Sequence, residues 1–75
     1  MADGFVHTVH KGGQWMNEIE GGGAEVGGVH ATKDEAVSVG RARAIQDGTE
    51  HVIHDEDGTI NERNSYGADP ASSPG

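Results

Sequence analysis

The sequence predicts a small α+β domain in which two β-hairpins flank one helix, in the order ββαββ. Three observations support this prediction. Apolar and polar residues alternate over 5–10 and again over 15–20, which is typical of strands with one buried face. Helix start and stop signals bracket 32–48, and an Asp-Gly turn separates short runs at 51–54 and 59–63. We therefore expect an antiparallel sheet of two hairpins, with the helix packed on one face.

The first hairpin is predicted from alternation on both sides of a glycine turn. Phe5, His7 and Val9 share one face of the first run, because successive side chains of a strand point to opposite faces. Gly12-Gly13 forms a connection of hairpin length, after which Trp15 begins the second run.

The segment 21–28 holds five glycines in eight positions. Glycine loses more backbone entropy on ordering than any other residue, so we expect a mobile loop here. Its glycine runs resemble a phosphate-binding loop only superficially, because no Lys-Ser or Lys-Thr pair follows them.

The helix is predicted from its termini and from one small-residue face. Thr32 suits the N-cap with Glu35 as its capping-box partner, and Gly48 suits a left-handed cap after an end near Asp47. The small residues recur four apart: Ala36, Gly40 and Ala44. We expect this face of the helix to pack closely against the sheet.

The second hairpin and the chain end complete one domain. Asp57-Gly58 is a strong turn signal between the two runs that it separates. We expect a single domain over 1–70 and a flexible C-terminal tail over 71–75. Hydrophobic residues make up only 32% of the chain, so the expected core is small: Val9, Trp15, Ile19, Val37, Ala44, Val52, Ile53 and Ile60. One of the adjacent pair Val52 and Ile53 must then point away from the helix.

The overall charge limits the classes of partner. Thirteen acidic residues against five lysines and arginines give a net charge of −8, which repels nucleic-acid phosphates. The chain has no cysteine, and we recognise neither a signal peptide nor a membrane-spanning run. We expect a cytoplasmic protein without disulfides or thiolate metal sites.

Several motifs, taken in order, resemble a small bacterial family known as domain of unknown function 2188. They are His7-Thr8-Val9-His10 with Gly13-Gln14-Trp15, then Thr32–Ala36, then Val52-Ile53-His54 with Asp57–Ile60, then Asn64–Pro70. The resemblance implies a small intracellular bacterial domain and carries over no established activity. This chain departs from the family pattern at His10, where proline is frequent, and at Asn64, where aspartate is usual.

The five histidines do not form a recognisable metal motif. His51 and His54 are three apart, hence on opposite faces of a strand, although His7 could meet one of them across a sheet. Zinc needs three or four converging ligands, and Asp55–Gly58 lacks the glutamate that would complete a calcium loop. With no nucleophile motif either, we expect no metal, no cofactor and no enzymatic activity.

The segment around Tyr66 is the candidate interaction surface. Aromatic residues and arginine are common interface anchors, and we therefore group the following residues: Trp15, Arg63, Ser65, Tyr66 and Gly67. The alternative is structural, with Tyr66 folding back as a lid over the core.

Two functions follow from these patterns. The first is a non-enzymatic binding or structural module that forms a homodimer or binds another protein, because one helix covers one sheet face and leaves the other. The alternative is a nucleic-acid-associated protein with a local basic face made by Lys33, Arg41, Arg43 and Arg63. Convergence of these cations would support the alternative, and their dispersal into pairs with acidic residues would remove it.

Overall fold

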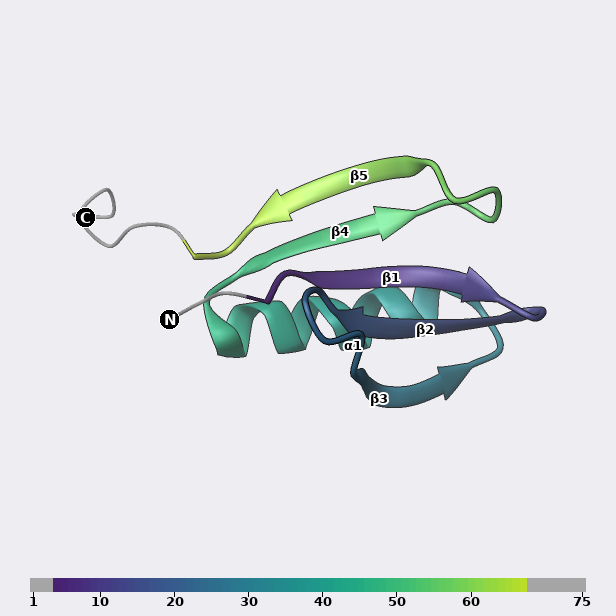
Figure 1. Cartoon of the computed structure of the whole chain (residues 1–75), viewed down its shortest axis with the longest axis horizontal. Helices are drawn as coiled ribbons and strands as arrows, with labels where there is room; N and C mark the ends of the chain where they lie inside the picture. Colours follow the sequence, from purple (N-terminus) through teal and green to yellow (C-terminus); the bar gives the residue numbers. More distant parts are fainter. Residues whose placement is uncertain (1–3, 68–75) are drawn as a thin grey trace.

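The computed structural model describes residues 4–67, so the predicted tail 71–75 lies outside the described residues. Five strands and one helix follow one another in the order βββαββ (Figure 1). The elements are β1 (Val6–Lys11), β2 (Gln14–Ile19), β3 (Glu25–His30), α1 (Lys33–Asp47), β4 (Glu50–His54) and β5 (Ile60–Ser65). The predicted α+β class is confirmed. The predicted order ββαββ lacked one strand, β3.

The strands form a single sheet in the order β3-β2-β1-β4-β5. Both predicted hairpins are present, because β1 pairs antiparallel with β2 and β4 pairs antiparallel with β5. The prediction of a fully antiparallel sheet was wrong, since β1 and β4 are parallel. The reason is α1, which carries the chain back along the sheet so that β4 starts at the same end as β1.

The third strand corrects the prediction of a mobile loop over 21–28. β3 pairs antiparallel with β2, and the register shifts between Met16 and Asn17. Opposite this shift Gly27 and Gly28 have φ of 78° and 80°, values that other residues rarely adopt. The glycines therefore form a bulge within a strand. The high number of glycines in this segment had indicated a loop.

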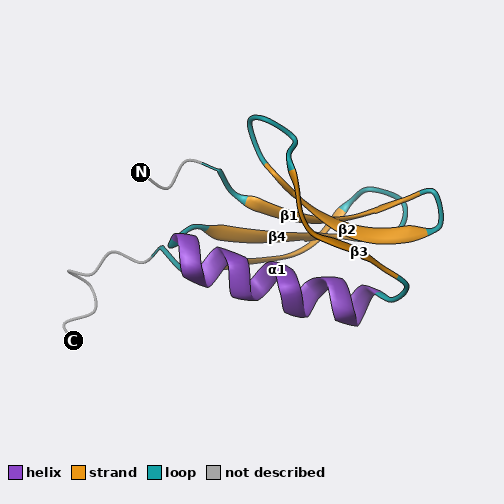
Figure 2. Ribbon diagram, turned by 90° about the horizontal axis from the view of Figure 1, so that it is seen from below, coloured by secondary structure: helices purple, strands orange, loops and turns teal. Residues whose placement is uncertain are grey.

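The helix agrees with its predicted bounds. The Thr32 side chain accepts from the backbone N–H of Glu35 at 3.2 Å, and Gly48 is a left-handed cap with φ of 65°. The small face is buried at Ala36, Gly40 and Ala44. α1 lies across one face of the sheet (Figure 2), and within residues 4–67 it contacts every strand except β5.

The second hairpin closes as its Asp-Gly signal predicts. The backbone N–H of Asp55 donates to the carbonyl of Thr59 at 2.8 Å, and that of Gly58 donates to Asp55 at 2.9 Å. The backbone N–H of Thr59 donates in turn to the Asp57 carboxylate, and this hydrogen bond lowers the pKa of Asp57. The turn is therefore held by backbone hydrogen bonds and by the side chain of Asp57.

The apolar core is smaller than predicted and differently composed. Its buried members are Val6, Trp15, Ala36, Ala44, Val52 and Ile53. Val9, Ile19 and Val37 are only partly buried. Ile60 was expected in the core and is 53% exposed, because it pairs with His54 on the sheet face opposite α1.

A polar cluster fills the core between the sheet and Gly40. The Thr8 hydroxyl donates to Asn17 Oδ1 at 2.6 Å and so accepts from His51 Nε2 at 2.7 Å. Asn17 Nδ2 donates to the carbonyl of Ala36 at 2.9 Å, which ties the cluster to the helix. Burial lowers the pKa of His51, and the charge of Arg41 lowers it further. His51 is therefore a neutral structural group.

Candidate functional site

The sheet face opposite α1, which we call the open face, carries a row of apolar side chains. Val9, Met16 and Val29 lie opposite one another on β1, β2 and β3. Ile60 on β5 pairs with His54 on β4 and continues the row on the same face. Val29 is 44% exposed and Ile60 is 53% exposed, which makes them two of the three exposed large hydrophobic residues in the described chain. The row crosses the sheet and is apolar on every strand except β4, where His54 lies between Val9 and Ile60.

Val52 lies on the open face and is nevertheless 2% exposed. The register places it between His7 on β1 and Arg63 on β5, and these long side chains cover it. Ile53 points toward α1, beside Thr8. The prediction that one of this adjacent pair points away from the helix is confirmed.

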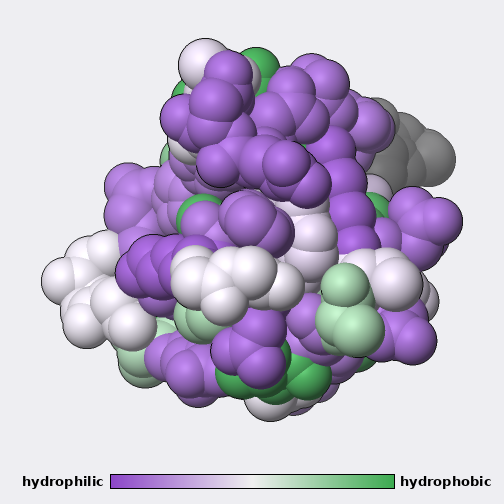
Figure 3. All heavy atoms as spheres, turned by 90° about the vertical axis from the view of Figure 1, so that its right-hand side faces the viewer, coloured by the Kyte–Doolittle hydropathy of each residue, from purple (hydrophilic) through white to green (hydrophobic). Residues whose placement is uncertain are grey.

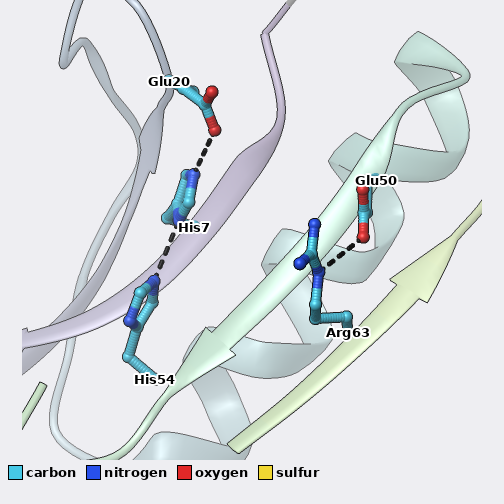
Figure 4. Close-up of polar contacts among 5 residues, drawn as sticks. All are labelled: His7, Glu20, Glu50, His54 and Arg63. Carbon is cyan, nitrogen blue, oxygen red and sulfur yellow. Dashed lines mark hydrogen bonds and ion pairs between the residues drawn. The ribbon is translucent and has the colours of Figure 1, made fainter. Parts of the chain in front are cut away.

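Two ion pairs border the apolar row on the open face. Lys11 Nζ lies 2.7 Å from Glu18 Oε2, across the first hairpin. Arg63 Nε donates to Glu50 Oε2 at 2.8 Å (Figure 4), and this hydrogen bond raises the pKa of Arg63. In both pairs the cation is more than half exposed and the carboxylate is partly buried, so solvent screens the attraction and each pair contributes little to folding stability. Their importance is that the face presents both signs of charge.

A chain of hydrogen bonds crosses the open face between the two hairpins. His7 Nε2 lies 2.7 Å from Glu20 Oε1, and His7 Nδ1 lies 2.9 Å from His54 Nε2 (Figure 4). His54 Nδ1 reaches the carbonyl oxygen of Gly58 at 3.1 Å. The expectation that His7 meets one of the two β4 histidines is confirmed, and His51 is on the opposite face as predicted.

The predicted interaction residues fall into two groups. Arg63, Ser65, Tyr66 and Gly67 follow one another along β5 and past its end, where the backbone N–H of Tyr66 donates to the carbonyl of Thr49 at 3.1 Å. Trp15 lies near the opposite end of the sheet, at the start of β2. A surface that uses all five residues would have to span the length of the sheet.

The end of β5 borders a hollow of about 210 Å³. It is lined by Phe5, Gly48, Thr49, Glu50, Ser65 and Gly67. Thr49 is 3% exposed, and its hydroxyl has no hydrogen-bond partner within residues 4–67. Tyr66 is half-buried beside this hollow, which agrees with a structural role for the segment and leaves its predicted interaction role untested.

Trp15 is 7% exposed and belongs to the core more than to the surface. Its ring lies 4.7 Å from that of His10, and Lys33 Nζ lies 5.6 Å from the ring centroid. Trp15 and Lys33 border a second hollow, which is also lined by Asp55, Glu56 and Asp57. Seen from this end of the molecule, the surface is mostly hydrophilic, and hydrophobic atoms show only in small separate areas (Figure 3).

The cations proposed for a basic face are dispersed. Lys33 pairs with Asp55 at 3.0 Å and Arg43 with Asp47 at 2.8 Å, while Arg63 pairs with Glu50. Arg41, the fourth cation of the predicted basic face, is exposed on α1. By the criterion set out above, the pairing of the other three with acidic residues weighs against a basic face, and nucleic-acid binding stays an untested prediction. Among residues 4–67, no three histidine or acidic side chains come together as a metal site. The same residues include no helix with the length and apolar character needed to cross a membrane.

The comparisons with known proteins place the chain in one family. Residues 6–66 match the family described as an uncharacterized protein conserved in bacteria, DUF2188. The chain belongs to the DUF2188 family. The resemblance seen in the ordered motifs is thus confirmed, over nearly the same span. No curated protein and no solved structure matches the chain.

The sequence alone did not reveal the apolar row on the open face. The alternation that would place Val29 beside Met16 is interrupted by the bulge at Gly27-Gly28, so no regular period connects β3 with β2. Ile60 was recognised as a strand residue, but its exposure depends on which face of the sheet α1 covers. Only the order of the strands shows that these side chains share a face.

Proposed function

We propose that this DUF2188 domain is a non-enzymatic binding module that self-associates through its open face. The observation that carries the proposal is the apolar row formed by Val9, Met16, Val29 and Ile60, which no element of residues 4–67 covers. Water-exposed apolar side chains that align across several strands favour association, because contact removes them from solvent together.

A second copy is the partner that the charges favour. With neutral histidines, the open face carries two cations, Lys11 and Arg63, and four carboxylates, Glu18, Glu20, Glu25 and Glu50, which leaves −2 on this face. The whole chain carries −8, so the other residues carry −6. Two copies that meet through the open face therefore bring together surfaces with only part of the net charge, and the mixed signs allow ion pairs between the copies.

The absence of a catalytic role is part of the proposal. Three of the described histidines take part in structural contacts: His7 and His54 join the two hairpins, and His51 lies in the core under Gly40. Catalytic acid–base groups instead need access to a substrate in a pocket.

Sedimentation velocity over a concentration series tests self-association. We expect the weight-average mass to rise above the 7.8 kDa of one chain as concentration increases into the high micromolar range. A strict monomer across that range would overturn the proposal.

A matched pair of variants locates the contact. Ile60→Lys changes the open face, whereas Ile45→Lys changes α1 at a residue of almost the same exposure, 54% against 53%. Both substitutions reduce the net negative charge, so neither can weaken association by added long-range repulsion. We expect Ile60→Lys to shift the protein to monomer and Ile45→Lys to leave association unchanged. Equal behaviour of the two variants would refute the open face as the contact.

A further inference from the structure

The hydrogen bonds around His7 and His54 determine how many protons the two rings hold. His54 Nδ1 faces the carbonyl oxygen of Gly58, which can only accept, so this nitrogen carries a proton. His7 Nε2 faces the Glu20 carboxylate, which also accepts, so it carries a second. The 2.9 Å contact between His7 Nδ1 and His54 Nε2 needs one proton between two nitrogens.

The complete network therefore holds three protons on four ring nitrogens. Two neutral imidazoles carry only two protons, so the His7–His54 pair has a single positive charge. A fourth proton would place two N–H groups face to face, and loss of the third would leave one of the three contacts without a hydrogen. All three contacts coexist only in the singly charged state.

The remaining charged groups that face this pair are already balanced. Glu18 lies opposite His7 on β2 and pairs with Lys11. Glu50 on β4 pairs with Arg63 on β5. The extra proton therefore compensates Glu20, the carboxylate at the end of the hydrogen-bond chain, which has no lysine or arginine partner among the described residues. Glu25 also lies on this face, but on β3, with β2 between it and β1.

We propose that His7 and His54 share a single proton, which acts as a pH-sensitive latch across the parallel junction of β1 and β4. The network joins the first hairpin to the second, and through Glu20 and Gly58 it reaches the connections that follow β2 and β4. When the proton leaves, the contact most easily given up is that of Glu20, whose side chain is 53% exposed. Rising pH then frees Glu20 while the rings stay in contact.

The shared proton can be observed directly by nitrogen NMR of the labelled imidazole rings. We expect a stage of the titration with scalar coupling between His7 Nδ1 and His54 Nε2 and a protonated His7 Nε2. As the pH rises, His7 Nε2 should lose its proton and the coupling should persist. The proposal fails if no coupling occurs at any pH, or if His54→Gln leaves the titration of His7 unchanged.

The variant Glu20→Gln tests the role of the carboxylate. A glutamine amide can donate to His7 Nε2, so the neutral pair, with two protons, satisfies every contact. We expect ring-to-ring coupling together with an unprotonated His7 Nε2, and protonation of this nitrogen only at lower pH than in the unmodified protein. The control is Glu25→Gln, which removes an exposed carboxylate on β3 and should leave the titration unchanged. Equal shifts of the His7 titration in both variants would mean that Glu20 acts only through its long-range charge, and this result would overturn the proposal. These measurements do not depend on self-association.

Discussion

Replacing Gly40 with alanine tests whether the polar core limits how closely α1 can lie on the sheet. An added Cβ would fall well within van der Waals contact of Asn17 Oδ1 and 2.7 Å from His51 Nε2. Both side chains are almost completely buried, at 0% and 1% exposure, and both are hydrogen-bonded to Thr8. Neither can move away without breaking a buried hydrogen bond.

The expected loss follows from three contributions. Overpacking a tight core costs about 1–3 kcal/mol. A buried polar group left without its partner costs about 1–3 kcal/mol more. Against these, alanine in place of glycine in a helix gains about 1 kcal/mol. We expect Gly40→Ala to lower the free energy of unfolding by about 3 kcal/mol, a large part of the stability of a domain of this size.

Urea unfolding, followed by circular dichroism and Trp15 fluorescence, measures the effect. Ala42→Gly at an exposed position of α1 is the control and should lose only about 1 kcal/mol, the helix propensity difference. The double variant Gly40→Ala with Asn17→Ala removes the side chain that the new Cβ would contact. Its loss of unfolding free energy should therefore be smaller than the sum of the losses in the two single variants. A stabilised Gly40→Ala protein would refute the reasoning, since helix propensity alone predicts that result.

Three further predictions concern the pH dependence of stability, the N-terminal cap of α1 and the close approach of Gly67 to Gly48. Because burial lowers the pKa of His51, the unfolded chain binds a proton at this residue more readily than the folded protein does. The contribution of His51 to folding stability is therefore full above the ordinary pKa of 6.5 and decreases as the pH falls toward the lowered pKa. The urea midpoint should drop less between neutral pH and pH 5 in His51→Gln than in the unmodified protein. Thr32→Ala removes the side-chain cap of α1 and should cost about 1 kcal/mol in urea unfolding, and an unchanged midpoint would contradict the capping role. Gly67→Ala would drive a Cβ into the carbonyl of Gly48, so the bond from the Tyr66 N–H to Thr49 should weaken and this amide should exchange faster with solvent; equal exchange rates would show that the approach is not tight.

Local signals in the sequence were enough to place α1 and both hairpins. Thr32 with Glu35 defines the helix start, and Gly48 its end, through contacts among residues no more than a few positions apart. The two-glycine turn and the Asp-Gly turn work in the same way, since each brings together strands that are adjacent in the chain. The small-residue face of α1 was also readable, because helical spacing alone aligns Ala36, Gly40 and Ala44.

The third strand and the parallel pairing of β1 with β4 were decided by tertiary structure. The chain between β1 and β4 passes through two strands and a helix, so no short-range pattern specifies which strands become neighbours. The glycines of β3 form a strand only because β2 offers a partner for a bulged edge. The contact of His7 with His54 and the apolar row of the open face depend on that strand order, since residues far apart in sequence share a face only once the strands are side by side.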